Sequence, residues 1–386
     1  MNSVEILTSL CNLPTAPYRE QHVIAWLLAF ARSLEKAVRV RRDGVGNVYL
    51  EYRRGRASAR GGRPVVIEAH MDHPGFVLMG RSRAGDLRAE FRGGVRPSCF
   101  AGARVGFWEE GEGGGRWVRT RVLRVKQVRG KRTLRVTLAG VREKLPAGAI
   151  GMWDLPDARV TKGIFAARVC DDIGGVAAIA CLLKELVEKQ VEGHVIGLCT
   201  RAEEVGFAGV LAVCENGWIP RGSSVIGLET SKASAGSPQG AGPIIRVGDR
   251  TGIFSPGLSY FLSQTAGHIA DEDASFKYQR KLMDGGTCNS TAFLAYGYDS
   301  AGLCLALGNY HNMTVKGEVG WGDGTKAGKA IASETIHAGD FAGMVRLLME
   351  TVRRFGKYEP GLEVFRKRLS KMHREEQRGM FRANPV

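Results

Sequence analysis

The amino-acid sequence predicts an α/β fold in which buried strands alternate with helices. Short apolar runs bounded by turn residues, VVIEAH, VIGLCT and SVIGLE, have the length and composition of buried strands. The run DDIGGVAAIACLLKELVEKQ, which lies between the first two, is long enough and apolar enough to form a helix. Open α/β sheets build their sites beyond the carboxyl ends of the strands. Polar residues at these ends are therefore candidate site residues.

Each of these strands leads to a side chain that can ligate a metal ion. VVIEAH ends at His70, SVIGLE ends at Glu229, and the later run LCLALGNYH ends at His311. Glu203 and Glu204 follow VIGLCT, just beyond the predicted end of that strand. One such residue alone is usually a packing or solvated side chain. Several of them at the ends of separate elements indicate a shared site.

Two aspartates open the predicted helix that starts near residue 171. Asp171 and Asp172 lie at its N-terminus, where a carboxylate is favoured, and either of them could simply cap the helix. An aspartate here completes a His, Asp, Glu, Glu, His set, which suits two divalent ions better than one because a carboxylate can bridge them. Glu203 would then remain beside a ligand, where a general base for a metal-activated water is expected. Spacing alone does not choose between Asp171 and Asp172.

The other elements complete the α/β pattern around these runs. The first part of the chain is expected to form a helix over 19–35, a turn and strand over 41–52 and the strand ending at 70. After the barrel segment come the helix from 171, a strand over 194–200, a helix near 206–216, a strand over 224–229 and a strand in GAGPIIRV. The last part is expected to form a helix after DGGTC, the strand leading to 311, an amphipathic helix over 337–355 and a polar, basic helical tail from 357. The remainder of 231–277 shows no clear periodicity.

The pattern of apolar and polar residues changes between about Gly75 and Thr161. Short alternating runs such as LRAEF and TLRVTLAGV are separated by glycine-rich turns, which is typical of a small barrel or sandwich. This stretch predicts an inserted all-β domain, which separates His70 from Asp171 by about a hundred residues.

Composition limits the possible functions. The chain has 386 residues, 44% of them apolar and 24% charged, which is ordinary for a globular protein. No apolar run approaches the roughly 20 residues that cross a bilayer, and the eight cysteines form no CxxC pair. We therefore expect a cytoplasmic protein with reduced cysteines and no membrane partner.

The net charge of +16 raises the possibility of a nucleic-acid partner. Residues 81–150 carry 17 Lys and Arg against 6 Asp and Glu, and residues 351–386 carry 10 against 4. The segments with the proposed ligands are close to neutral. The basic segments also lack interleaved aromatic residues apart from Trp108 and Trp117, so a nucleic-acid partner is not expected.

Asp72 follows His70 in an HxD pair. A carboxylate at this distance can orient the imidazole through its second nitrogen, as residues behind metal ligands often do. An aspartate in a turn is the alternative explanation.

Taken together, these segments resemble the M42 family of metallo-aminopeptidases, the glutamyl and tetrahedral aminopeptidase group of the dinuclear zinc exopeptidases. The matching pieces, in order, are AHMDHPGF, VCDDIGG, RAEEVGFAGV, DGGT and the final His311. The resemblance implies a three-layer, mixed-sheet zinc-exopeptidase fold. Its catalytic domain would comprise 1–74 and 163–350, with a β-barrel domain inserted over 75–162 and a basic helical extension over 351–386.

The resemblance also assigns roles to individual residues. It implies one metal held by His70, Asp171 and Glu229, and a second held by Asp171, Glu204 and His311. Asp171 would bridge the two ions because the family motif places the bridging residue first. The catalytic residues would be Glu203, as the proton shuttle, and Asp72, as the support for His70.

M20-type carboxypeptidases and deacylases share this ligand order, but they carry their extra domain later in the chain. The early insertion favours M42. The sequence also departs from the family: His73-Pro74 replaces an acidic-apolar pair, Cys288-Asn289 replaces Asp-Ala, and Glu229 stands where aspartate is frequent.

The expected function is that of a metallo-aminopeptidase, a protease that removes N-terminal residues from peptides with a free N-terminus. The expected cofactors are two divalent ions, zinc first, with cobalt or manganese possible, and the chain is expected to form a homo-oligomer. Two alternatives remain, an M20-like deacylase or carboxypeptidase with the same metal centre and a basic nucleic-acid-binding protein.

Overall fold

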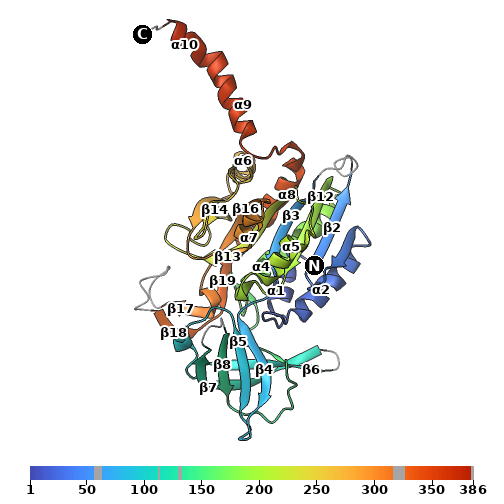
Figure 1. Ribbon diagram of the computed structural model, residues 1–386, viewed down its shortest axis with the longest axis vertical. Coiled ribbons are helices and arrows are strands. Elements are labelled where there is room, and N and C mark those ends of the chain that lie inside the picture. Colours follow the sequence, from blue (N-terminus) through green and yellow to red (C-terminus); the bar gives the residue numbers. More distant parts are fainter. Residues whose placement is uncertain (56–62, 112–113, 129–132, 316–326, 384–386) are drawn as a thin grey trace.

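The computed structural model describes residues 1–55, 63–111, 114–128, 133–315 and 327–383, and a mixed sheet lies at its centre (Figure 1). In spatial order its strands are β1 (Val38–Arg42), β2 (Val48–Arg54), β12 (Gly193–Thr200), β3 (Val65–His70), β13 (Ser224–Lys232), β16 (Asp299–Leu307), β14 (Ile244–Asp249) and β15 (Gln279–Met283). The four strands β12, β3, β13 and β16 run parallel, so their carboxyl ends meet at one edge of the sheet.

Helices cover both faces of this sheet. One face carries α1 (Ser3–Cys11), α2 (Gln21–Ser33), α4 (Ile173–Glu188), α6 (Pro256–Glu272) and α8 (Ala338–Arg354), and the other carries α5 (Ala208–Asn216) and α7 (Asn289–Ala295). Alternate residues of β3 point to the two sides. Val65 and Ile67 join the core under α4, whereas Val66 joins the core under α5 and α7. The result is three layers.

Helix α4 packs closely on the sheet because β12 has a glycine beneath it. A Cβ atom at Gly197 would lie 2.5 Å from Cγ2 of Ile179, so any larger residue would force the helix away. The N-cap of α4 is Asp172, whose side chain accepts a hydrogen bond from the amide of Gly175 at 3.2 Å. These two features fix the start of α4 next to the sheet edge.

The predicted all-β segment forms a closed barrel. Its strands follow the order β4 (Gly75–Arg81), β5 (Leu87–Arg92), β8 (Thr133–Leu138), β7 (Gly114–Gln127), β6 (Arg104–Gly111) and β9 (Ile150–Trp153). Edge-to-face aromatic contacts fill its interior, formed by Phe76, Phe91, Phe100, Phe107 and Trp153. Figure 1 shows the barrel at one end of the molecule, beside the sheet edge where the parallel strands finish.

Two small sheets complete the body. One has the order β10 (Arg159–Thr161), β11 (Ile164–Ala167) and β19 (Glu334–His337), and the other pairs β17 (Met313–Val315) with β18 (Ala327–Ile331). Short 3₁₀ turns occupy Pro97–Cys99, Glu203–Val205, Tyr310–Asn312 and Phe355–Lys357.

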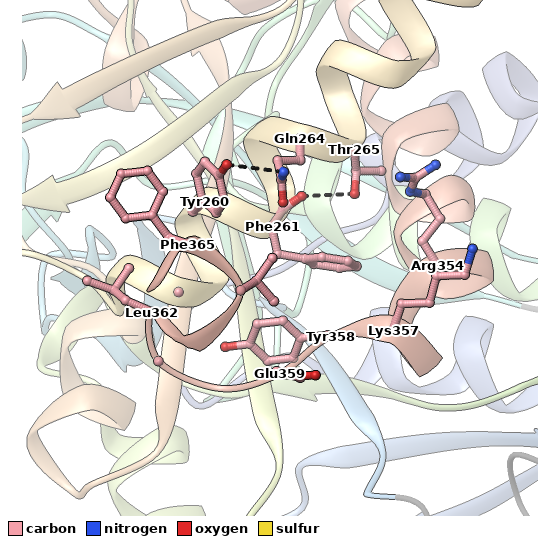
Figure 2. Close-up of a pocket in the computed structure, with 13 residues that line it drawn as sticks. Tyr260, Phe261, Gln264, Thr265, Arg354, Lys357, Tyr358, Glu359, Leu362 and Phe365 are labelled. Atoms are coloured by element: carbon pink, nitrogen blue, oxygen red, sulfur yellow. Dashed lines mark hydrogen bonds between the residues drawn. The ribbon is translucent and has the colours of Figure 1, made fainter. Parts of the chain in front are cut away.

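The C-terminal arm consists of α9 (Glu363–Met372), a π turn over His373–Gln377 and α10 (Arg378–Ala383), and it extends away from the body at the end opposite the barrel (Figure 1). A cavity of about 190 Å³ lies at its root, between α6 and the start of α9 (Figure 2). The aromatic side chains of Tyr260, Phe261, Tyr358 and Phe365 line this cavity, and none of the predicted site residues does.

The predicted fold class, a mixed-sheet α/β protein with an inserted barrel, is confirmed. The domain limits stay a prediction. Two strand ends differ from expectation. Strand β13 continues three residues beyond Glu229, and β16 stops at Leu307, which leaves His311 in a 3₁₀ turn. Within the described ranges, no helix combines the length and apolar character that crossing a bilayer requires.

Candidate metal centre

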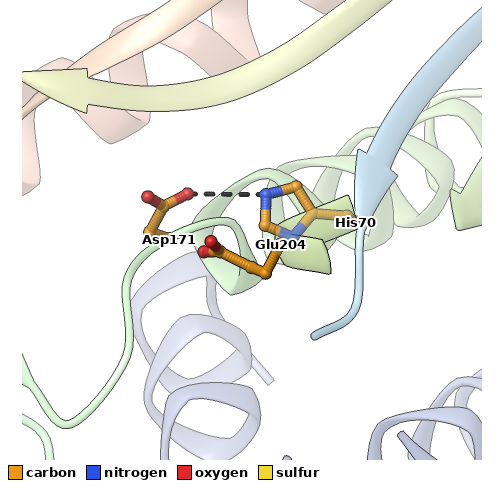
Figure 3. Close-up of side chains that lie close together, drawn as sticks. All are labelled: His70, Asp171 and Glu204. Carbon is orange, nitrogen blue, oxygen red and sulfur yellow. Dashed lines mark ion pairs between the residues drawn. The ribbon is translucent and has the colours of Figure 1, made fainter. Parts of the chain in front are cut away.

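The carboxyl ends of the parallel strands bring three of the predicted ligands together. His70 is the last residue of β3 and pairs with Thr200, the last residue of β12. Glu204 lies in the 3₁₀ turn that follows β12, and Asp171 precedes α4. Figure 3 shows the side chains of His70, Asp171 and Glu204 directed towards one another.

Asp171 lies between the two predicted histidine ligands. Its Oδ1 is 3.5 Å from Nε2 of His70, and its Oδ2 is 3.6 Å from Nε2 of His311. Oε1 of Glu229 lies 3.8 Å from the His70 nitrogen, and Oε1 of Glu204 lies 3.1 Å from the His311 nitrogen. The five side chains thus form two half-sites that share one carboxylate.

Backbone carbonyls fix the tautomers of both imidazoles. Nδ1 of His70 lies 3.0 Å from the carbonyl oxygen of Asp72, and Nδ1 of His311 lies 2.8 Å from that of Gly94. A carbonyl only accepts, so each Nδ1 carries a proton and donates it. Each Nε2 is therefore the nitrogen that can bind a cation placed between the ring and the carboxylates.

Burial makes this cluster of charges costly without a positive partner. His70, Asp171 and His311 are at most 5% exposed. Burial alone would lower the pKa of His70, but its carboxylate partners, Asp171 first, raise it well above its usual range. Burial and the nearby Asp171 charge raise the pKa of Glu229 to about 7. The cluster therefore either holds extra protons or binds cations.

The donor set fits divalent cations. Oδ1 of Asp171 and Oε1 of Glu204 are buried without a hydrogen-bond donor. Ligand atoms of His70, Asp171 and Glu204 lie within 4.8 Å of one another, as do those of Asp171, Asp172 and Glu229. Imidazole nitrogens and carboxylate oxygens are the ligands that zinc and similar ions take in proteins.

Asp72 supports the centre in a different way from the one expected. The hydrogen-bonding partner of His70 Nδ1 is the Asp72 backbone carbonyl, while its carboxylate Oδ1 lies farther away, at 3.6 Å. That carboxylate accepts hydrogen bonds from the backbone amides of Glu203 at 2.9 Å and Glu204 at 3.1 Å. Asp72 thus fixes the turn that carries both glutamates.

The chain resembles a known peptidase family over part of its length. Residues 136–319 match the family model described as M42 glutamyl aminopeptidase. The match covers 184 of the 386 residues, so the chain is similar to the M42 peptidase family over slightly less than half of its length. The match identifies an aminopeptidase, a hydrolase of peptide bonds.

Solved structures share the fold of this chain. The TET aminopeptidase from a marine sediment Thaumarchaeota archaeon is 19% identical with a TM-score of 0.71, covering 91% of this chain and 97% of its own. The aminopeptidase APDkam598 from the archaeon Desulfurococcus kamchatkensis is 19% identical with a TM-score of 0.70, covering 91% and 94%. The Pyrococcus horikoshii TET1 peptidase is 20% identical with a TM-score of 0.68, covering 91% and 99%. The comparison with curated protein sequences found no match.

The two adjacent aspartates, Asp171 and Asp172, have different surroundings. Asp171 faces both histidines, which lower its pKa against the effect of burial. Asp172 caps α4, and burial raises its pKa well above the usual range. The geometry therefore favours Asp171 as the shared carboxylate.

Sequence reasoning missed the contacts of three polar residues behind the proposed metal centre. Oε2 of Glu334 accepts the backbone amides of Cys170 at 2.7 Å and Asp171 at 3.0 Å. His73 and Asn312 lie between the Asp171 segment and the turn of His311. Only the position of His73 next to the HxD pair was a local signal, because the partners lie far apart in the sequence.

Proposed function

We propose that this aminopeptidase works with two divalent cations, which are held beyond the carboxyl ends of the parallel strands. The proposed ligands are His70, Asp171 and Glu229 for one cation, and Asp171, Glu204 and His311 for the other. The observation that carries the proposal is that the two oxygens of Asp171 face different imidazoles, at 3.5 and 3.6 Å. Zinc is the expected ion, and cobalt and manganese suit the same nitrogen and oxygen donors.

The bound cations would supply Lewis-acid polarisation of the scissile carbonyl and of the attacking water. Glu203 is the proposed proton carrier. It accepts the proton of the water during attack and delivers it to the leaving amine. Burial and neighbouring carboxylates raise the pKa of Glu203 well above its usual range, which favours a carboxyl that both takes and returns a proton.

The substrates are peptides with a free N-terminus, because the family activity removes N-terminal residues. The decisive experiment combines metal content with cleavage of matched free-amine and N-acetylated aminoacyl substrates, each with and without a chelator. About two metals per chain and chelator-sensitive cleavage of the free-amine substrates alone are expected. Equal cleavage of the N-acetylated substrates would favour a deacylase and contradict the proposal.

We also propose that this chain assembles into a homo-oligomer. The Pyrococcus horikoshii TET1 peptidase can assemble into a tetrahedron or a large octahedral shell. This chain shares its fold over 91% of its length, so we expect a homo-oligomer here as well. Light scattering on the full chain tests this expectation, and a monomeric mass would contradict it.

A further inference from the structure

His73 is a buried histidine that none of the proposed catalytic steps uses. Its side chain is fully buried, and both ring nitrogens have partners on other loops. Nδ1 lies 2.8 Å from the backbone carbonyl oxygen of Asp171, and Nε2 lies 3.0 Å from Oδ1 of Asn312. The ring therefore connects the segment of the shared carboxylate to the turn that carries His311.

The hydrogen-bond directions in this connection are determined by the partners. Asn312 Nδ2 donates to the carbonyl oxygens of Arg168 at 2.9 Å and Ala332 at 3.1 Å, which orients the amide so that Oδ1 faces His73. The carbonyl of Asp171 also accepts only. Both ring nitrogens of His73 therefore face acceptors, and the site requires a side chain that donates two hydrogen bonds.

The turn that His73 fastens adopts a costly backbone conformation. Asn309, His311 and Asn312 have φ values of 54°, 53° and 63°, in the left-handed region that residues with a Cβ rarely occupy. Such a turn persists only where surrounding contacts hold it. Within the described residues, those contacts include the three hydrogen bonds of the Asn312 side chain and the bond from His311 Nδ1 to Gly94.

From this geometry we infer that His73 is a positioning residue for the half-site formed by Asp171, Glu204 and His311. It sets the distance between the Asp171 carboxylate and the His311 imidazole by holding their two backbones on either side of one ring. The other half-site shares Asp171, but its remaining ligands, His70 and Glu229, belong to β3 and β13, which pair directly. Loss of His73 should thus weaken the cation site of His311 more than the other.

The inference rests on the proposed two-cation centre. Its test distinguishes a failure of the His73 inference from a failure of the two-cation proposal. The probe is Co²⁺, titrated into the metal-free full-length protein while affinity and the visible absorption of bound cobalt are recorded. The wild-type chain should bind two ions. His73→Ala should bind the first ion normally and the second about 10- to 100-fold more weakly, as other losses behind metal ligands do.

Two further substitutions separate positioning from simple packing. The NH₂ group of His73→Gln can donate two hydrogen bonds and should restore most of the second-site affinity. The carboxylate of His73→Glu only accepts, so it would face two acceptors and should bind the second ion most weakly. A space-filling role alone would not rank Gln above Glu, since these side chains have nearly the same size.

His194→Ala is the matched control. His194 lies near the amino end of β12, at the opposite end of the strand from the proposed ligands, so this variant should leave both cobalt sites intact. If the wild-type chain binds two ions and the three His73 variants bind them with wild-type affinity, this inference alone is overturned. A wild-type chain that binds fewer than two ions would overturn the two-cation proposal and, with it, this inference.

Discussion

The side-chain amide of Asn289 donates a hydrogen bond of 2.7 Å to Oε1 of Glu68, a carboxyl with no exposed surface. Thr200 donates to the same oxygen at 2.6 Å, while Oε2 has no partner. Burial therefore outweighs these hydrogen bonds and raises the pKa of Glu68 to about 7. The resemblance to M42 implies an alanine at the position of Asn289, so the hydrogen bond between Asn289 and Glu68 departs from that expectation.

This pair predicts a pH-dependent stability. Because the folded chain binds the Glu68 proton more tightly than the unfolded chain, the contribution is complete below about pH 4.5 and is lost as the pH rises to about 7. The loss amounts to roughly 3 kcal/mol. Glu68→Gln cannot ionise, so its free energy of unfolding relative to wild type should change by that amount between pH 4 and pH 8. Urea unfolding of both metal-free proteins checks this, and a pH-independent difference would contradict it.

The two aspartates before α4 should respond differently to amidation. Asp171→Asn removes the charge that faces both imidazoles and should abolish tight binding of at least one metal. Asp172→Asn should bind metal normally, since asparagine caps helices as well as aspartate and resembles the protonated form that burial favours. Metal analysis after dialysis decides the matter. Normal binding by the Asp171 variant would show that the shared carboxylate is misassigned.

Glu203→Gln should separate chemistry from metal binding. The proposed role predicts an unchanged metal content and a kcat about 100- to 10,000-fold lower, which is the usual contribution of general acid and base catalysis. Glu215→Gln, at an exposed position on α5, is the matched control and should keep the wild-type rate. A Glu203 variant with near-normal turnover would exclude this residue as the proton carrier.

The C-terminal arm should be dispensable for folding. Its apolar side chains are exposed, with Leu362, Phe365, Leu369 and Met372 between 37% and 48% accessible. Truncation after Gly361 should therefore shift the Tm by only a few degrees. Truncation after Met349 is the contrasting control, because it removes the buried Val352 and should destabilise the protein clearly. Differential scanning calorimetry of the two truncated proteins compares them, and a large loss after Gly361 would show that the arm belongs to the core.

Much of the fold, and the gathering of the proposed ligands in one place, could be predicted because their signals are local. Apolar runs that lead to His70, Glu204 and Glu229 follow from strand length and side-chain type, and parallel pairing then brings them to one edge. Helix α6 was missed because Ser259 and Thr265 lie on its buried face, which weakens the apolar periodicity.

The residues behind the ligands could not be predicted in the same way. His73 and Asn312 are 239 residues apart, and Glu334 lies 163 residues from Asp171. Their contacts depend on how distant loops fold against one another, which no local pattern records. Asp72 could be named as a candidate from the HxD pair, but only the folded turn shows that its carboxylate accepts the backbone amide of Glu203.

The bond from His311 to the carbonyl of Gly94 joins the catalytic body to the segment between β5 and β6 of the barrel. A proposed ligand thus owes its tautomer to the insertion. If relatives exchanged barrel domains, each new barrel would have to place a backbone carbonyl where the carbonyl of Gly94 lies. Changes in the barrel are therefore constrained by the proposed metal site in another part of the fold.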